Sequence, residues 1–524
     1  MGTMELEFSF RTRSSGAARS PGDVVKVLLM GDFSGQRLAG TSVAETLATE
    51  TSESDLNPVL LKVDVDNFDQ RMARIAPSLQ LQIEDSGGSI VIDFEELDDF
   101  HPDNLYRRLD VFQGLRRLRK RLMDPQTFAE AAAELRKDLP AFGGGAVQSI
   151  GDSSLKQGAT DAEAEGDMVE RLLGKPSDGT VTSSLGASEV KQQDFDTFIR
   201  HLVSPHLSAG VDDRQQSYVS SVDDSISSLM RRILRDPAFQ ALESSWRSLY
   251  RVISQLETGE ELVLYMLDLP KSGLQQVLSA SSGELEDSCL YKLLMAEDAV
   301  LGDAPWSLLA GDYSFAATEV DVSLLTAMGA IASCAGGPFM ASADLALIGC
   351  ESAAQAASPE SWQVQDQDCA KRWSEFRQEP WAAWVGLALP RILIRLPYGR
   401  DSDEIDSFEF EEVPVPDKDM NAYLWGSPAY AITQLLAHSH QSRGWSLPRG
   451  DQLLVDDLPA YTYTGDDGAE LLPCTEVSFS ERATAKVQAA GLMPLLSFRG
   501  RNAARVFSVH SLADSDSALA GPWQ

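Results

Sequence analysis

Short apolar runs separated by polar turns recur along the first hundred residues and predict β-strands. The clearest run is VVKVLLMGDFSG, residues 24–35, in which an apolar strand is closed by a glycine-containing turn. Leu6, Phe8 and Phe10 alternate with polar residues near the start of the chain, and this period of two predicts another short strand over residues 4–13. Similar runs predict strands at 59–65, 79–83 and 90–94.

A period of three to four residues replaces the alternation after Pro102 and predicts one amphipathic helix that ends near Met123. Its apolar face would carry Leu105, Leu109, Phe112, Leu115, Leu118 and Leu122. Its polar face would carry Arg107, Arg108, Arg116, Arg117, Arg119, Lys120 and Arg121. This is the one dense basic run of the chain, so the face is a candidate contact surface, with an ordinary solvated face as the alternative.

Apolar periodicity stops between residues 139 and 188, where Gly, Ser, Thr and Asp dominate in the way typical of a flexible linker. Helical periods resume at 195–203, 222–234 and 239–253, and a strand signal starts at Glu261. Helix and strand signals then alternate as far as the run VFSVHSL. The whole pattern predicts an α/β fold with mixed sheets, in two parts joined by the linker.

The charge balance narrows the range of partners. The 524 residues include 79 Asp and Glu but only 44 Lys and Arg, which gives a formal net charge of −35. Nucleic acid and anionic membranes attract basic surfaces, so the sequence argues against both as partners. Residues 322–343 form an uncharged stretch, but Gly336, Gly337 and Pro338 would break a helix before it crossed a bilayer.

The sequence offers no residues with the spacing of a catalytic, cofactor or metal site. DVDNFDQ, residues 64–70, resembles a calcium loop, but Phe68 stands where an oxygen ligand is required. His438 and His440 are two residues apart and would point to different helix faces. We therefore expect a protein that is not an enzyme and has no cofactor. An enzyme or small-molecule binder on an α/β scaffold is a distant alternative, since a fold alone does not decide function.

Two long stretches resemble the subunits of the type VI secretion contractile sheath. Residues 20–138 resemble the small subunit (TssB, VipA type) through VKVLLMGDFSG, VDVDNFDQRMARIAPSLQL and IDFEELDDFHPDNLYRRLDVFQGLRRLRKRL. Residues 189–512 resemble the large subunit (TssC, VipB type) through SLMRRILRDPAFQALESSWRSLYRVI, GGPFMASADLALIG, LALPRILIRLPYGRDSDEIDSFEFEE and CTEVSFSERATAKVQAAGLMPLL. The phrases are collinear, so one polypeptide resembles a fused small and large pair.

This resemblance implies a division of the chain. We expect an N-terminal strand arm at 1–19, a small-subunit-like domain at 20–138, the linker at 139–188, a large-subunit-like domain at 189–512 and a polar tail at 513–524. The two sheath-like parts are expected to pack as one body. Large subunits of the family continue into a further C-terminal domain that helps to accept donated strands, and the resemblance implies that this chain lacks that domain.

The resemblance also implies a structural function in the bacterial cytoplasm. Family members assemble by strand exchange and head-to-tail packing, and Leu6, Phe8 and Phe10 occupy the place of a donated strand. The implied partners are further copies or other sheath subunits, an inner tube of Hcp type, baseplate proteins and a ClpV-type unfoldase. The unfoldase would grip a helix through Met168, Val169, Leu172 and Leu173, unless this is an incidental linker helix. The alternative function is a non-contractile paralogue that caps, terminates or regulates sheath or baseplate assembly.

An acidic run, DSDEIDSFEFEEVPVPDKD at residues 401–419, is a candidate counterpart of the basic face. The candidate contact residues in it are Asp401, Asp403, Glu404, Glu411 and Glu412. A lattice of subunits with so large a like charge would repel itself unless basic strips met acidic ones. We therefore expect salt-dependent assembly if the run meets a basic strip, and a solvated loop if it does not.

Overall fold

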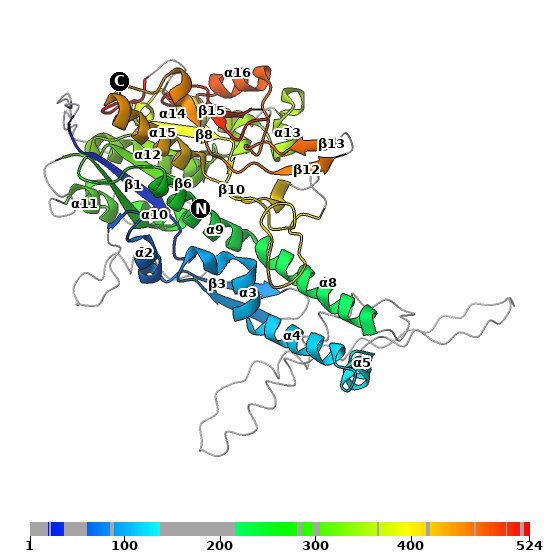
Figure 1. Ribbon diagram of the computed structural model, residues 1–524. Helices are drawn as coiled ribbons and strands as arrows, with labels where there is room; N and C mark the ends of the chain where they lie inside the picture. Colours follow the sequence, from blue (N-terminus) through cyan, green and yellow to red (C-terminus); the bar gives the residue numbers. More distant parts are fainter. Residues whose placement is uncertain are drawn as a thin grey trace, which may run out of the picture. The chain divides into compact units, whose positions relative to one another are not determined.

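The structure is a computed structural model (Figure 1). It describes residues 19, 22–35, 60–83, 88–136, 215–279, 285–296, 304–363, 366–414, 420–465, 468–498, 500–513 and 518–523. The predicted N-terminal strand, the linker and the predicted helix at 195–203 lie outside these residues. The chain divides into two compact units, of which the larger holds residues up to Leu109 together with Ser227 onward and the smaller runs from Asp110 to Ile226.

A nine-stranded sheet is the centre of the larger unit, with strand order β11-β15-β14-β8-β7-β6-β1-β5-β2. Its strands are β1 (Val25–Gly31), β2 (Leu61–Val63), β5 (Leu262–Asp268), β6 (Leu308–Phe315), β7 (Phe339–Ala343), β8 (Val385–Leu389), β11 (Leu454–Val455), β14 (Met493–Ser497) and β15 (Ala504–Val506). The strands from β14 to β5 run parallel, whereas β2, β15 and β11 are antiparallel to their neighbours. The predicted α/β fold with mixed sheets is confirmed.

Strand β1 brings two distant parts of the sequence into one sheet. It lies between β5 and β6, with Leu28 opposite Tyr265 on one side and Leu309 on the other. All of its residues are buried, as expected of a parallel strand covered on both faces. Leu28 and Met30 belong to the core on one face of the sheet, so the intervening Leu29 points to the opposite face.

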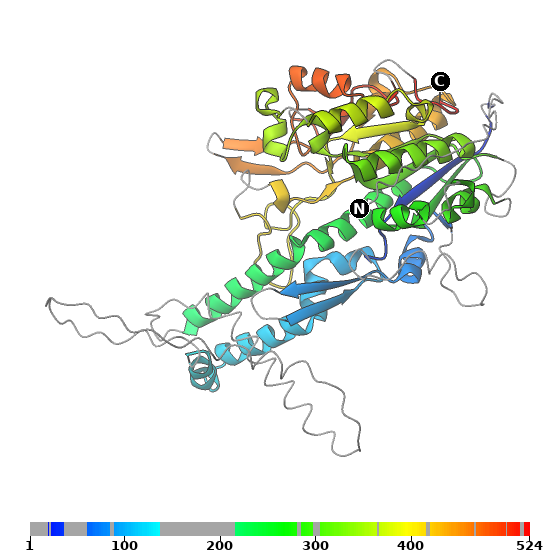
Figure 2. The ribbon, with the colours of Figure 1, turned by 180° about the vertical axis from the view of Figure 1, so that it is seen from behind.

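Helices cover both faces of the sheet, which Figures 1 and 2 show from opposite sides. The core that contains Leu28 and Met30 is completed by residues of α10 (Lys271–Ser279), α11 (Cys289–Met295), α12 (Glu319–Ala335) and α14 (Gln367–Phe376). The opposite face is covered by α9 (Pro237–Ser254) and α15 (Pro428–Arg443), which pack against each other. On that side Tyr430 donates a hydrogen bond to the Met30 carbonyl at 2.9 Å.

The rest of the N-terminal region packs on α9 through aromatic rings. It consists of α2 (Phe68–Ile75), the hairpin of β3 (Ser78–Ile83) and β4 (Gly88–Asp93), the 3-10 turn η2 (Leu97–Phe100) and α3 (Pro102–Arg108). Phe68 meets Trp246 edge-on with ring centroids 5.6 Å apart, and Phe100 meets Phe239 in the same way at 5.6 Å. Residues 68–108 of the region that resembles the small subunit therefore share a hydrophobic core with α9 in the larger unit.

The predicted helix between Pro102 and Met123 is in fact two helices, α3 and α4 (Asp110–Met123). Leu109 between them has extended backbone angles, φ −73° and ψ 132°, and is the last residue of the larger unit. The period of apolar positions passes through this break without a change, so it predicted a single helix. Asp110 opens α4 with a carboxylate in the first turn, where the helix dipole favours negative charge.

The uncharged stretch at 322–343 forms part of α12, a turn and β7. Thr318 caps the start of α12 by accepting a hydrogen bond from the Asp321 amide, and Gly336 ends it with a left-handed backbone at φ 89°. The predicted break at the Gly-Gly-Pro sequence is confirmed. Among the helices that the structure describes, none has both the length and the apolar content needed to cross a bilayer.

The smaller unit is helical. It contains α4, α5 (Phe128–Arg136) and the first part of α8 (Gln215–Leu234). Its apolar core includes Phe112, Leu115, Leu118, Leu122, Tyr218 and Val222. The remaining α-helices and β-strands, all in the larger unit, are α13 (Ala353–Ala356), α16 (Glu481–Ala489), β9 (Ile392–Leu393), β10 (Trp425–Gly426), β12 (Thr462–Gly465) and β13 (Gly468–Leu471).

Candidate functional site

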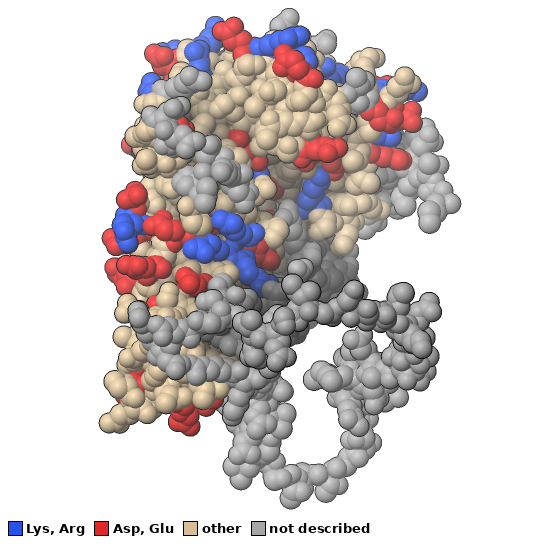
Figure 3. All heavy atoms as spheres, turned by 90° about the vertical axis from the view of Figure 1, so that its right-hand side faces the viewer, with Lys and Arg blue, Asp and Glu red and all other residues tan. Residues whose placement is uncertain are grey.

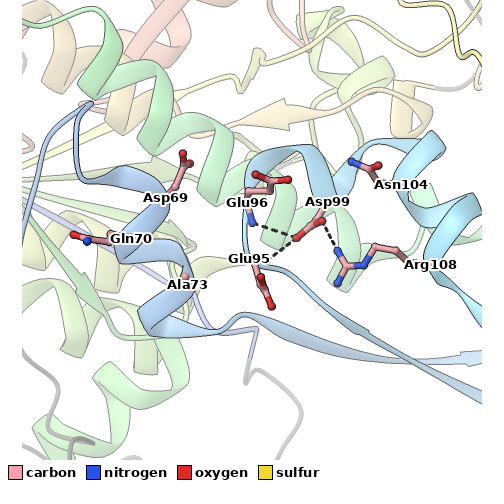
Figure 4. A pocket seen from close by; sticks show the side chains of 8 residues that line it. All are labelled: Asp69, Gln70, Ala73, Glu95, Glu96, Asp99, Asn104 and Arg108. Carbon is pink, nitrogen blue, oxygen red and sulfur yellow. Dashed lines mark hydrogen bonds and ion pairs between the residues drawn. The ribbon is translucent and has the colours of Figure 1, made fainter.

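One of the two predicted basic residues on α3, Arg108, is engaged within the larger unit. Arg108 forms an ion pair with the buried Asp99 and donates to the Asp93 carbonyl at 3.0 Å. The Asp99 carboxylate also accepts hydrogen bonds from the backbone amides of Glu95 and Glu96, at 2.7 and 3.2 Å. Figure 4 shows how η2 and α3 bring these groups together. Arg108 therefore organises the local fold rather than presenting an uncommitted charge.

An acidic pocket surrounds this ion pair. It has a volume of about 750 Å³ and is lined by Asp69, Gln70, Ala73, Glu95, Glu96, Asp99, Asn104 and Arg108. Arg108 is the one basic side chain in this lining, and Asp99 holds it. The other predicted basic residue on α3, Arg107, has an exposed side chain.

On α4, the basic residues fall into paired and unpaired sets. Arg119 binds both carboxylate oxygens of Asp223 on α8, at 2.5 and 3.1 Å, and Arg121 binds Glu134 on α5 at 2.9 and 3.1 Å. Arg116 is half-buried on the same helix. Arg117 and Lys120 are exposed and have no ion pair with any residue that the structure describes. On α4, these two residues are the part of the predicted strip that is exposed and without an ion pair among the described residues.

The acidic run divides into an exposed part and a buried residue. Asp401, Asp403, Glu404 and Glu411 are exposed, but Glu412 is only 1% exposed. Glu412 is therefore not part of an accessible acidic face, because its carboxylate points into the protein. Residues 415–419 of the run lie outside the described residues.

A buried ion network holds Glu412. The Arg395 guanidinium forms two hydrogen bonds to Glu412, at 2.7 and 3.0 Å, and two to Glu243 of α9, at 2.7 and 3.2 Å. Arg247 also binds Glu243 at 2.7 Å, and the Tyr398 amide donates to Glu412 at 2.8 Å. Burial by itself opposes ionisation, but Arg395 and Arg247 hold the pKa of Glu243 below its ordinary value. Each carboxylate of the network thus has a guanidinium partner.

Further contacts fix the backbone of the acidic run, while Asp401, Asp403, Glu404 and Glu411 are exposed. Asp103 of α3 accepts hydrogen bonds from the amides of Asp406 and Ser407, at 3.1 and 2.9 Å. Arg231 donates to the Glu411 carbonyl at 2.7 Å. In addition, the ring of Tyr106 lies 4.8 Å from that of Phe408. The run is therefore an anchored acidic surface, and its anchor includes a helix of the small-subunit-like region.

Sequence reasoning missed Glu243, Arg395 and Asp103. A signal for the first two was present, because each stands in a mostly apolar run that carries only one other charged residue, FQALESSWRSL with Arg247 and LALPRILIRLP with Arg391. A charge at such a position is buried with a partner or not buried at all. Their pairing with each other joins residues 152 positions apart, and no local pattern indicates it.

Acidic and basic side chains are close neighbours on the visible surface. In Figure 3, blue Lys and Arg side chains lie among red Asp and Glu side chains rather than in a separate field. Among the ion pairs of the larger unit, those of Arg482 with Glu360 and of Arg501 with Asp456 are exposed on both sides. Such pairs contribute little to stability because water and salt compete with them.

A larger cleft, of about 1130 Å³, lies at the carboxyl ends of β1, β6, β7 and β8. Ligands bind at this edge in many α/β proteins. Here the Ser245 hydroxyl donates to Asp312 at 2.6 Å, and Arg391 binds Glu476 at 2.6 Å. Asp344 accepts from the Ala346 amide at 2.8 Å. These charged groups of the cleft are already bonded to the chain and hold its loops.

The remaining predicted site residues are those of the donated strand, those of the unfoldase-binding helix and two histidines. The donor residues Leu6, Phe8 and Phe10, and the unfoldase-helix residues Met168, Val169, Leu172 and Leu173, lie outside the described residues. His438 is exposed, whereas His440 packs against Trp445 with ring centroids 4.4 Å apart. Within the described ranges, no three His, Cys, Asp or Glu side chains gather as metal ligands would.

Two family models match separate parts of this chain. The model described as EvpB/VC_A0108, tail sheath N-terminal domain (VipB), matches residues 216–513, which is more than half of the chain. The model described as type VI secretion system, VipA, VC_A0107 or Hcp2 matches residues 7–142. The chain therefore belongs to the VipB family of tail-sheath proteins, and it carries a VipA-like region in the same polypeptide.

Among curated proteins, the type VI secretion system sheath protein TssC1 of Pseudomonas aeruginosa is 31% identical over 304 residues. The match takes in 57% of this chain and 61% of that protein, so the chain spans about three-fifths of its relative's length. The resemblance to both sheath subunits that the sequence predicted is confirmed.

Proposed function

We propose that this chain is a structural subunit of a type VI secretion sheath in which one polypeptide supplies both the small and the large subunit. The position of β1 between β5 and β6 is the observation that carries this proposal. A strand of the VipA-like region in the middle of the VipB-like sheet fixes a one-to-one ratio of the two parts. Because they are covalently joined, each part also meets the other at a high effective concentration.

The proposed subunit acts by assembly and needs no catalytic residue. Copies pack head to tail into an open helical array, and donated strands tether them. The work of such an array comes from the difference in contact free energy between two lattice arrangements. On this proposal the partners are further copies or other sheath subunits, with an inner tube of Hcp type, baseplate proteins and a ClpV-type unfoldase as family partners, in the bacterial cytoplasm.

The described surfaces support one contact between copies. Asp401, Asp403 and Glu404 form the exposed edge of the anchored acidic run, and Arg117 and Lys120 are the unpaired basic side chains of α4. We propose that these two surfaces meet between neighbouring copies. Opposite charges at the surface of so acidic a protein steer association and weaken as salt screens them.

Electron microscopy and sedimentation of the purified full chain test the proposal. Long tubes at low salt that dissolve at high salt are the expected result. A protein that stays monomeric at low salt would overturn the self-assembling sheath and favour the alternative, a non-contractile paralogue that caps, terminates or regulates assembly. Regular tubes from this chain by itself would eliminate that alternative.

A charge exchange tests the contact itself. Arg117→Glu with Lys120→Glu is expected to prevent tubes, and the added changes Asp401→Lys with Glu404→Lys are expected to restore them. Arg74→Glu with Arg443→Glu is the matched control, because both residues are exposed and have no ion pair among the described residues. If the control blocks assembly as strongly as the α4 variant, net charge rather than this contact is responsible.

A further inference from the structure

The two ends of the described chain meet at one serine. Arg19 donates from one guanidinium nitrogen to the Ser307 hydroxyl at 2.6 Å and from another to the carbonyls of Trp306 and Pro305, at 2.6 and 3.1 Å. At the other end of the chain, the indole nitrogen of Trp523 donates to the Ser307 carbonyl at 2.9 Å. Figures 1 and 2 place the start of β1 and the C-terminal tail at the same edge of the sheet.

An aromatic platform lies behind these hydrogen bonds. The Arg19 guanidinium lies 4.8 Å from the ring centroid of Trp445, and Trp523 meets the same ring edge-on at 5.3 Å. Burial lowers the pKa of Arg19 to about 10, so the side chain is still a cation near neutral pH. A guanidinium against an indole face gains from the cation–π attraction as well as from its hydrogen bonds.

The C-terminal tail is held here more firmly than its polar composition predicted. Leu519 and Trp523 are each only 2% exposed. The Ala520 amide donates to the Ala383 carbonyl at 2.8 Å, directly before β8. Gly521 has a positive φ of 107° and lies against Pro338, where a side chain would be strained. The tail thus packs on the amino-terminal edge of the sheet.

Ser307 links these contacts to strands β1 and β6 of the sheet. Its amide donates to the Lys26 carbonyl at 2.8 Å, and its hydroxyl accepts from the Lys26 amide at 3.1 Å. Lys26 belongs to β1 and Leu308, the next residue, opens β6. Arg19 is therefore coupled through a single residue to β1 and β6, two neighbouring interior strands of the nine-stranded sheet.

We infer that Arg19, Ser307, Trp445 and Trp523 form a terminal clasp that fixes the root of the N-terminal arm, residues 1–18. The inference rests on the proposed function, in which a neighbouring copy takes up that arm. With the clasp closed, a pull on the arm is transmitted at Arg19 into β1 and β6. With the clasp open, the anchor moves to the start of β1, and about six more residues add roughly 20 Å of slack at about 3.4 Å each. Arg19 is thus a positioning residue for assembly, because a fixed root lowers the ordering cost of each tether.

The test compares four purified full-length variants. Arg19→Ala removes the hydrogen bonds and the cation, and Arg19→Lys keeps only the cation. Trp523→Phe keeps the ring and removes the indole hydrogen bond. Arg482→Ala is the matched control, because Arg482 makes an exposed ion pair with Glu360 at 2.9 Å elsewhere in the larger unit.

Three quantities are measured on each variant: the midpoint of thermal unfolding, amide hydrogen exchange over residues 22–30, and the critical concentration for assembly. Arg19→Ala is expected to raise the critical concentration about tenfold or more, since hydrogen bonds to a charged group are commonly worth that factor. It should also speed exchange near Lys26 while the unfolding midpoint moves by only a few degrees. Arg19→Lys is expected to recover part of the loss, and Arg482→Ala to match the parent chain.

The outcome separates this inference from the proposed function. Replacing Leu6, Phe8 and Phe10 with Asp tests the arm itself. If that triple variant fails to assemble and Arg19→Ala assembles like the parent chain, the clasp inference is wrong and strand donation stands. If neither change affects assembly, strand donation itself is wrong. Should Arg19→Ala not fold, the comparison of Arg19→Lys and Trp523→Phe with the control decides in the same way.

Discussion

Two sets of arginine–carboxylate pairs in this molecule have nearly the same geometry and very different surroundings. In the larger unit, Arg395 lies 2.7 Å from both Glu243 and Glu412, and the three side chains are 9%, 0% and 1% exposed. In the helical unit, Arg119 lies 2.5 Å from Asp223, and these side chains are 37% and 38% exposed. Similar bond lengths thus describe one set sealed from water and one pair in competition with water and salt.

On the proposed function, the two sets of pairs have different roles. The buried network tolerates one arrangement only, because a charge left there without its partner is costly, and it fixes the backbone behind the acidic run. The exposed pair links α4 to α8 weakly, so Arg119 can exchange Asp223 for another carboxylate at small cost. A rigid acidic surface and a basic helix with replaceable partners are what a reversible contact between copies requires.

Breaking the buried network is expected to have the largest effect. Arg395→Ala leaves the carboxylates of Glu243 and Glu412 buried without a cation, and we expect a loss of about 3–5 kcal/mol in the free energy of unfolding. Urea denaturation followed by circular dichroism measures it. Because the network fixes residues 396–412, the same variant should lose protection from proteolysis there first.

Arg391→Ala is the matched control for that variant. Arg391 lies four residues earlier and makes the same kind of two-bond pair with Glu476, at 2.8 and 2.6 Å, but its side chain is 49% exposed while that of Glu476 is 9% exposed. We expect a smaller loss than for Arg395→Ala, of about 1–2 kcal/mol, because one carboxylate rather than two loses its cation and water reaches the site of the guanidinium. If the two variants lose equal stability, burial is not what separates the two sets of pairs.

Asp268 sharpens the comparison, because it is a partly buried carboxylate that has no cation in contact among the described residues. Its oxygen accepts from the amides of Phe33 and Ser34, at 2.8 and 3.1 Å. Burial raises its pKa to about 6, and the neighbouring Asp32 adds to the rise. The pKa of Asp268 in the folded state is higher than its ordinary value of 3.8. At a pH between 3.8 and about 6, the folded state therefore keeps a proton that the unfolded chain has released. The stability from Asp268 is therefore complete at low pH and is lost as the pH rises through about 6.

Asp268→Asn tests this directly, because the amide oxygen still accepts both backbone hydrogen bonds and no longer titrates. We expect the variant to be more stable than the parent chain by roughly 1–3 kcal/mol near pH 8 and equal to it near pH 4. Urea denaturation across that range measures the difference, and the exposed Asp224→Asn is the control. A stabilisation that does not change with pH would show that the charge of Asp268 is not its cause.

The sequence predicted the elements of this fold better than their partners. The apolar run at 24–35 predicted β1, and the periods at 222–234 and 239–253 predicted helices found in α8 and α9. Local patterns carry no information on strand order, so the insertion of β1 between β5 and β6 was not foreseen. The break at Leu109 was also missed, because one extended residue does not disturb a period of three to four.

For the candidate site, too, the sequence predicted where the charged residues lie in the chain better than which groups they contact. Charge runs located the basic strip and the acidic run, but not which of their members are buried. Glu412 differs from Glu411 only in the direction of its side chain, and that direction is set by Arg395 and by the Tyr398 amide. Arg108 and Arg117 look alike in the sequence, yet Asp99 holds the first within the larger unit and the second has no ion pair among the described residues. Exposure of a charge is a tertiary property and needs the fold.

The smallest effect is expected for the exposed pair of Arg119 and Asp223. Arg119→Ala removes a two-bond pair that is more than one-third exposed on both sides, so we expect a loss below about 1 kcal/mol in the free energy of unfolding, smaller still at high salt. Urea denaturation at low and high salt measures it, with Arg117→Ala, which removes an unpaired charge from the same helix, as the control. A loss of several kcal/mol that salt does not reduce would show that Arg119 is a fixed structural pair like Arg395. Arg119 would then not exchange the Asp223 carboxylate for another one. On α4, only Arg117 and Lys120 would remain open to a neighbouring copy.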